Sequence, residues 1–167
     1  MKTTNMKLWA GCVLCGAILG GQAAAAGDVY ITGGTTIIQG QTVTAVDDFR
    51  EPLSDYGTWM ETDEFGPVWQ PEVVVTDVSW RPYCHGGRWM WTERGWFWQS
   101  TYAWGWAPFH YGRWAYIRHH GWVWVPDVIW APAWVEWRST ETHVGWAPMY
   151  AAPRSEYSVG FSYQSDG

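Results

Sequence analysis

The chain has 167 residues, of which 17 are tryptophan, and carries a formal net charge of −6 from 10 Lys and Arg against 16 Asp and Glu. An acidic balance of this kind argues against nucleic acid and against anionic lipid as partners. The length is sufficient for one domain with a substantial core.

The first 26 residues are predicted to be a secretory signal peptide. Lys2 and Lys7 precede an apolar run over residues 8–21, and small residues follow up to Ala26. The run is too short and too rich in glycine for a membrane-spanning helix, so we expect an exported protein that is not a transmembrane protein. Cleavage after Ala26 leaves 8 arginines, no lysine and 16 acidic residues, a formal charge of −8. The expected location is periplasmic, outer-envelope associated or extracellular.

Cleavage at that point also removes Cys12 and Cys15. Cys84 then has no partner within the chain, and it is predicted to be a buried thiol or to form an intermolecular bridge.

Composition divides the remainder into three parts. Residues 27–46 are a lead-in segment that forms a loose strand pair or a flexible arm, and residues 150–167 are small and polar and are predicted to be a flexible tail. Residues 47–149 form the Trp-rich repeat domain, in which Leu53 is the sole leucine while Val, Trp, Tyr and Thr abound. These residue types favour strands, and no stretch predicts a convincing amphipathic helix.

A frame of Gly, one residue, Trp, a short polar turn, Gly and a second Trp recurs within the repeat domain. Copies lie at residues 56–71, 87–98 and 111–126, and a degenerate fourth lies at 134–146. The connectors 92–95 and 118–121 are polar and end in Gly, as a hairpin turn requires. The sequence therefore predicts an all-β fold of tandem antiparallel β-hairpins that form a curled sheet or a small barrel or sandwich.

Six prolines stand two residues after a tryptophan, where the two side chains share one face of a strand. Because proline has no N–H to donate, each Trp-x-Pro is predicted to mark a strand exit. The pairs are Trp69 with Pro71, Trp80 with Pro82, Trp106 with Pro108, Trp124 with Pro126, Trp130 with Pro132, and Trp146 with Pro148.

The motifs at residues 80–83, 102–114 and 130–134 resemble the tryptophan-rich YXWGXW-repeat proteins of bacteria, which are secreted proteins of unassigned function. The likeness covers about residues 47–149, although Tyr102-Ala103-Trp104-Gly105-Trp106 lacks the spacer before its last Trp. The resemblance implies an exported, β-rich envelope protein and supplies no catalytic residue.

Alternation along the predicted strands places Trp114, Tyr116, Trp122 and Trp124 on one side and aliphatic residues on the other. Either the sheet closes over one side and the other is covered, or one side is displayed as an aromatic surface. Aliphatic side chains are too few to form the core alone, so most indoles are expected inside, with a subset left for binding. The candidate binding residues are Trp89, Trp91, Trp96, Trp98, Trp114, Trp122, Trp124, Arg88 and Arg113. The arginines are expected to stack on rings or to pair with carboxylates.

Catalytic motifs are missing from the sequence: it has no nucleophile elbow, no phosphate loop and no marked proton donor. We therefore expect no enzyme and no cofactor, and predict a binding or scaffold protein of the cell envelope whose partner is an envelope protein or another copy of the chain. The alternatives are a glycan-binding module, in which Trp89, Trp91, Trp122 and Trp124 stack on sugars, and a copper or zinc carrier. The metal ligands would come from Cys84 and the histidines, which are His85, His110, His119, His120 and His143.

Overall fold

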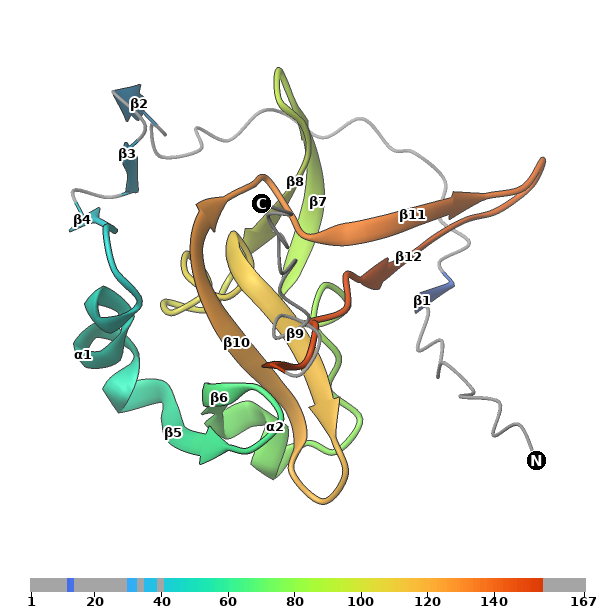
Figure 1. The fold of residues 1–167 in the computed structure, drawn as a ribbon. Helices are drawn as coiled ribbons and strands as arrows, with labels where there is room; N and C mark the ends of the chain where they lie inside the picture. The colour runs from blue at the N-terminus through green and yellow to red at the C-terminus, as the bar shows by residue number, and fades with distance from the viewer. Residues whose placement is uncertain (1–11, 14–29, 33–34, 39–40, 155–167) are drawn as a thin grey trace, which may run out of the picture.

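The computed structural model describes residues 12–13, 30–32, 35–38 and 41–154. In these ranges antiparallel hairpins form four separate sheets, and the helical segments are short (Figure 1). The prediction of an all-β chain of tandem hairpins is therefore confirmed. None of the helices in these ranges is long and apolar enough to cross a membrane.

The largest sheet joins the first and third copies of the frame. It contains β5 (Gly57–Thr62), β6 (Gly66–Pro71), β9 (Tyr111–Ile117) and β10 (Gly121–Trp130) in the order β5-β6-β10-β9. The two hairpins meet where Trp124 of β10 lies opposite Trp69 of β6. Copies that are 55 positions apart in sequence are thus neighbours in one sheet.

The other hairpins form smaller sheets. The second copy forms β7 (Gly87–Thr92) and β8 (Gly95–Ser100), and the fourth forms β11 (Val135–Ser139) and β12 (Val144–Pro148). The short β1 (Cys12–Val13) pairs with the outer edge of β12. The lead-in contributes β2, β3 and β4, which form one antiparallel sheet and span Tyr30–Thr32, Thr35–Ile38 and Gln41–Thr42.

The predicted turns are chain reversals, as the spacing of the frame requires. Gly66, Gly95 and Gly121 begin the second strand of their hairpins with φ of 77°, 95° and 84°, in the left-handed region that favours glycine. At two of these turns a threonine hydroxyl donates to the glycine carbonyl, over 2.9 Å from Thr62 and 2.8 Å from Thr92. The β9–β10 turn instead places His119 at φ 74°.

The Trp-x-Pro prediction holds for three of the six pairs, since β10 ends at Trp130, two residues before Pro132, and two further strands end at a proline. It fails for the other three, because Trp80 with Pro82 and Trp106 with Pro108 lie outside the strands, and the last pair lies inside β10. Pro71 ends β6 and Pro148 ends β12. Pro126 lies inside β10, where pairing with β9 stops at Val125 and resumes at Trp130. The missing N–H of proline interrupts the ladder there, but the strand continues past the irregularity.

Helical turns occur where the sequence analysis expected none. Residues 46–56 form η1 (Val46–Phe49), α1 (Arg50–Leu53) and η2 (Ser54–Tyr56), and residues after Pro71 form α2 (Glu72–Thr76). The α2 turn contains three consecutive valines, which favour a strand, yet it buries Val74 against the core. Tertiary packing overrides local preference in a segment that is only one turn long.

The connector at residues 101–110, which carries the YXWGXW-like motif, is a series of turns rather than a strand. Trp104 is buried there between two parallel rings, with centroids 4.4 Å from Tyr102 and 5.7 Å from Phe109. A Cβ on Gly105 would collide with the Ser100 hydroxyl, so glycine is needed for the chain to pass. The motif therefore fills the core from a loop.

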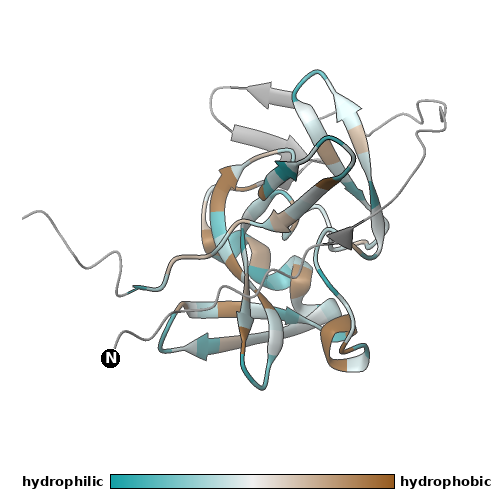
Figure 2. Cartoon of the chain, turned by 90° about the vertical axis from the view of Figure 1, so that its right-hand side faces the viewer, coloured by the Kyte–Doolittle hydropathy of each residue, from teal (hydrophilic) through white to brown (hydrophobic). Residues whose placement is uncertain are grey.

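The core consists of two clusters on opposite faces of the largest sheet. An aromatic cluster includes Trp69, Trp80, Trp114 and Trp124, and a smaller cluster includes Phe65, Val68, Ala115, Val123 and Ala151. Buried residues therefore lie on both faces of this sheet, while Tyr116 next to its β9–β10 turn is exposed. Figure 2 shows teal at the hairpin turns and brown only in short stretches.

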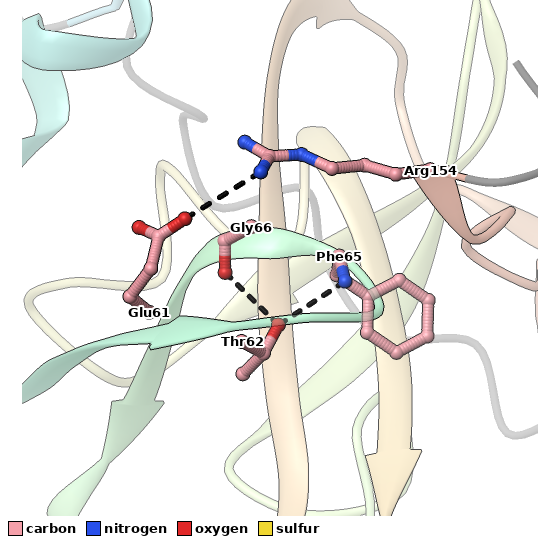
Figure 3. Close-up of polar contacts among 5 residues, drawn as sticks. All are labelled: Glu61, Thr62, Phe65, Gly66 and Arg154. Carbon is pink, nitrogen blue, oxygen red and sulfur yellow. Dashed lines mark hydrogen bonds and ion pairs between the residues drawn. The ribbon is translucent and has the colours of Figure 1, made fainter. Parts of the chain in front are cut away.

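Residues 150–154 cover the second face of that sheet, although the sequence analysis placed them in a flexible tail. Tyr150 forms a parallel bridge with Trp114, and the Arg154 N–H donates to the Glu64 carbonyl over 2.8 Å. The Arg154 guanidinium lies 3.6 Å from the Glu61 carboxylate beside the β5–β6 turn (Figure 3). The rest of the predicted tail lies outside the described residues.

Cys84 is disulfide-bonded in this structure of the full chain. The expectation of a buried thiol or an intermolecular bridge is therefore corrected for the full chain. That expectation assumed that Cys12 and Cys15 had been removed with the signal peptide.

Candidate binding site

Each hairpin contains a cross-strand pair of indoles near its open end, which we call the root pair. Residues directly opposite on antiparallel strands share one face, so the spacing of the frame brings two rings together. The root pairs are Trp59 with Trp69, Trp89 with Trp98, Trp114 with Trp124, and Trp137 with Trp146.

Root pairs supply much of the core. Trp124 and Trp69 are fully buried, and their indole N–H groups donate to the backbone carbonyls of Tyr111 over 2.7 Å and Leu53 over 3.2 Å. The glycine of the frame makes this packing possible, because a Cβ on Gly112 would meet the Trp124 Nε1 at 2.7 Å and the Val125 carbonyl oxygen. The recurrent Gly and Trp are therefore two parts of one packing unit.

A second ring pair lies next to the turn in two hairpins, and we call it the tip pair. In β7–β8 it is Trp91 opposite Trp96, and in β9–β10 it is Tyr116 opposite Trp122. Trp91 is 70% exposed, Trp96 46% and Tyr116 64%, whereas Trp122 is half-buried. Three of the four tip rings are thus exposed, whereas three of the four root rings on the same strands are buried and Trp89 is half-buried.

The tip pair of β7–β8 continues onto the neighbouring β11–β12 hairpin. Trp137 of β11 is 37% exposed, and its ring centroid lies 6.0 Å from that of Trp96. Trp96 and Trp91 are 5.4 Å apart with an interplanar angle of 76°. We call Trp91, Trp96 and Trp137 the indole ridge. Among the described tryptophans, these three are the exposed ones.

The ridge contacts a half-buried ring that packs on a buried one. Trp89 lies 4.7 Å from Trp137 and stacks parallel to Tyr83 at 5.9 Å. Tyr83 is fully buried, and its hydroxyl donates to the Phe109 carbonyl over 2.9 Å and accepts the Trp134 N–H over 3.2 Å. Burial raises the pKa of this hydroxyl well above its usual range. The ridge is therefore mounted on a support with fixed hydrogen bonds.

A second stack holds β8 from its other face. The His110 ring lies between Phe97 at 4.4 Å and Trp130 at 5.9 Å, nearly parallel to both. Its Nδ1 is 3.2 Å from the Ala131 carbonyl, to which it donates. Burial lowers the pKa of His110 to about 4, opposed by the backbone hydrogen bonds to Ala131 and Pro132. His110 is therefore a neutral packing residue at neutral pH.

The predicted site residues differ in burial, and the structure does not bring them together at one surface. Trp98, Trp114 and Trp124 are buried, and Trp89 and Trp122 are half-buried, so only Trp91 and Trp96 reach the surface as full contact residues. The rings proposed as a sugar platform, Trp89, Trp91, Trp122 and Trp124, lie on two hairpins of different sheets. They do not form one flat surface.

The two predicted arginines behave differently. The Arg113 guanidinium carbon lies 3.2 Å from the centre of the Trp134 ring, as the stacking prediction requires. Arg88 instead donates to the Gln99 side-chain oxygen over 2.8 Å. Neither is part of the ridge.

Trp137 is the ridge residue that the list of candidates missed. Its hairpin was predicted, but that copy of the frame is degenerate and offered no alternation from which to judge exposure. Only the packing of β11–β12 against β7–β8 puts its ring beside Trp96. Within the described residues, no three His, Cys, Asp or Glu side chains are grouped to hold a metal ion.

The family comparison covers the region that holds all four hairpins, since a family of unknown function, DUF6600, matches residues 50–153. The chain belongs to this DUF6600 family. No curated protein and no solved structure matches the chain. The matched range includes the indole ridge and the frame of this DUF6600 member, while the more specific likeness to the YXWGXW-repeat proteins stays a prediction.

Proposed function

We propose that this protein is a non-catalytic, exported binding and scaffold protein of the cell envelope, which holds a partner protein through the indole ridge. The observation that carries the proposal is the exposure of three adjacent indoles, whereas every other tryptophan in the described residues is buried or half-buried. Exposed apolar residues that occur singly are normal, whereas a contiguous aromatic group on a rigid support marks a contact surface. Export is supported by the signal-like composition of residues 1–26.

The chemistry of the ridge suits a protein surface. Tryptophan is enriched in the energetically dominant contacts of protein interfaces because it offers a large, rigid apolar area with little rotamer entropy to lose. No basic side chain belongs to the ridge, and the nearest turn holds Glu93 beside Arg94. The ridge therefore does not favour phosphate or another strongly anionic ligand.

A glycan is the second candidate, because exposed indoles also stack on sugar rings. The interplanar angles within the ridge are 76° between Trp91 and Trp96 and 39° between Trp96 and Trp137. Such tilted rings do not present a continuous flat platform, which is why a protein partner ranks first. Copper or zinc binding through Cys84 and the histidines stays a prediction, and it requires that the Cys84 disulfide be reduced, because the thiolate is the metal ligand.

The test is cosedimentation of the purified protein with isolated envelopes from cells that lack it. Replacing Trp91, Trp96 and Trp137 by alanine, singly and together, is expected to reduce retention, with the triple variant losing at least 10-fold. Tyr56→Ala is the matched control, because Tyr56 is an exposed ring away from the ridge. Equal retention of the triple variant and the unmodified protein would overturn the proposal.

The class of partner is tested on the same envelopes. Protease treatment before addition is expected to abolish ridge-dependent retention, and digestion of the polysaccharide with a muramidase is expected to leave it intact. The opposite pattern would replace the protein partner by the glycan candidate.

A further inference from the structure

A cleft of about 370 Å³ lies between α2 and the β9–β10 turn. Its apolar lining includes Val74, Trp80 and Trp122. Part of the rim is also apolar and faces solvent, since Val78 is 89% exposed and Val75 and Tyr116 are exposed as well, while His119 and His120 form its polar part. Single exposed apolar residues are normal on a protein surface, but three of them around one cleft indicate a contact site.

The size and lining of the cleft fit a single large apolar group. Ligand pockets for drug-sized molecules begin at about 300 Å³. An indole is smaller than such a molecule, so the cleft accommodates one indole with part of its strand. The floor includes the Gln70 amide, whose Nε2 donates to the His120 carbonyl. That hydrogen bond ties the floor to the β9–β10 turn.

The same molecule carries a projection of matching character. β7 and β8 form a two-stranded sheet with no other strand paired to it in the described ranges. Trp91 and Trp96 stand next to its turn, and Trp91 is the most exposed tryptophan described. An apolar hairpin tip and an apolar cleft are therefore both left uncovered.

One opposite-charge pair is available between the two. Arg118 is exposed beside the cleft residues His119 and His120, and no carboxylate is among the residues that line the cleft, although Asp77 directly precedes Val78. At the β7–β8 turn, the Arg94 guanidinium lies over the Trp130 ring of its own molecule at 5.7 Å, and the Glu93 carboxylate is exposed. Opposite charges of this kind orient two surfaces as they approach.

The tip and the cleft lie at opposite ends of the molecule. In Figure 1 the β7–β8 turn is at the top, and α2 and the β9–β10 turn are at the bottom. A tip therefore fills the cleft of a second molecule and not its own. Contacts between two different patches of identical chains propagate into rings or open filaments, whereas a self-complementary patch stops at a dimer.

We propose that copies of this chain associate head to tail, with the β7–β8 tip of one copy inserted into the cleft between α2 and the β9–β10 turn of the next. This inference rests on the proposed function, because it uses Trp91 and Trp96 of the indole ridge. A second copy of the chain fills the cleft, and the free tip at the end of each assembly stays available to the envelope partner. A scaffold role follows, since each added copy presents a new tip and a new cleft.

Sedimentation velocity over a concentration series in buffer tests the association. The unmodified protein is expected to sediment faster as concentration rises, beyond the value for a dimer. Trp91→Ala removes the tip ring and Val78→Glu places a carboxylate on the cleft rim against Glu93. Both positions are exposed, so the fold is expected to persist, as circular dichroism checks. Each variant should weaken association at least 10-fold, whereas Tyr56→Ala and Val128→Glu should not.

Mixing the two variants distinguishes a head-to-tail contact from a symmetric one. In an equimolar mixture, Val78→Glu molecules supply an intact tip and Trp91→Ala molecules supply an intact cleft, so a dimer should form and go no further. A mixture that stays monomeric would overturn the inference, and so would a Val78→Glu variant that associates like the unmodified protein.

Failure of this inference is separable from failure of the proposed function. If the unmodified protein is monomeric in buffer at every concentration, head-to-tail association is overturned, while ridge-dependent retention on envelopes still supports the proposed function. If the ridge variants keep full envelope retention, the proposed function is overturned whatever the sedimentation shows.

Discussion

The root and the tip of the β7–β8 hairpin carry the same kind of cross-strand indole pair and place it in different surroundings. Trp98 at the root is buried against Tyr83 and Phe109, and Trp91 at the tip is mostly in water. Trp98 and Trp91 project from the same face of the ribbon, so alternation along the strand does not explain their difference in burial. Their distance from the centre of the molecule does explain it, because the β7–β8 turn extends beyond the neighbouring elements. In the β7–β8 hairpin, position along the ribbon decides whether an indole stabilises the fold or is available for contact, whereas Trp137 is exposed although it belongs to a root pair.

The first prediction compares the two positions by stability. Trp124→Ala at the root of β9–β10 should lower the free energy of unfolding by about 3–5 kcal/mol, because it empties a fully buried site and loses the bond to Tyr111. Trp91→Ala at a tip should cost less than about 1 kcal/mol. Urea denaturation followed by circular dichroism measures both. Similar losses at the two positions would remove the energetic basis of the comparison.

Two glycines, one beside a root pair and one at a hairpin turn, give a second comparison. Gly112 has φ 60° and lies against the Trp124 ring and the Val125 carbonyl, so Gly112→Ala combines strain with a collision and should cost about 3 kcal/mol. Gly95 at a turn has φ 95° with nothing within 4 Å of an added Cβ. Gly95→Ala should cost only about 1 kcal/mol. Thermal or urea unfolding checks the difference, and Gly145→Ala, which meets nothing within 4 Å, is the control for the substitution itself.

The buried His110, which stacks between Phe97 and Trp130, should make the stability of the fold sensitive to acid. The pKa of His110 is about 4 in the folded state against an ordinary value of 6.5, so the unfolded state binds the proton more tightly. This contribution is fully present above pH 6.5 and is lost as pH falls from about 6.5 to 4, a change of about 3 kcal/mol at 1.36 kcal/mol per pH unit. His110→Phe keeps a ring between Phe97 and Trp130 and should flatten the stability curve over that range. If the free energy of unfolding of His110→Phe falls with pH as steeply as that of the unmodified protein, another group causes the loss of stability in acid.

The smallest expected effect is a change in the quenching of tryptophan fluorescence, and it does not involve stability. Acrylamide reaches exposed indoles, so Trp91→Phe and Trp96→Phe should lower the quenching constant of the whole protein more than Trp124→Phe does. The last ring is fully buried and contributes little quenchable emission. If all three substitutions reduce quenching equally, the tips are covered in solution. Sedimentation of the same samples would then show whether a second copy covers them.

Much of the fold could be predicted from the frame alone. The hairpins at β5–β6, β7–β8, β9–β10 and β11–β12, and the turns at 92–95 and 118–121, follow from Gly and Trp at fixed spacing, because turn geometry and cross-strand pairing are local. The helical turn at α2 was missed, since three valines favour a strand and only the packing of Val74 selects the helix. The packed segment 150–154 was missed for a similar reason: its small, polar residues give no periodic signal, and its contacts are with distant strands.

The candidate site was predicted only in part. Trp91 and Trp96 were among the candidates, but so were Trp98, Trp114 and Trp124, which are buried. A period-two pattern reports which face of a strand a side chain occupies and carries no information on what lies beyond that face. Trp137 joins the ridge through contacts between separate hairpins, and such contacts are invisible to any local pattern.

The sequence by itself determined that the chain folds into repeated antiparallel ribbons with paired indoles, because those features depend on neighbours within about fifteen positions. Only the tertiary structure decided which pairs are enclosed, which reach water, and where an apolar cleft opens at the far end from the exposed tips. The physical reason is that burial is a property of how separate ribbons stack. The free energy gained there depends on the area that distant residues remove from water, which no single ribbon specifies.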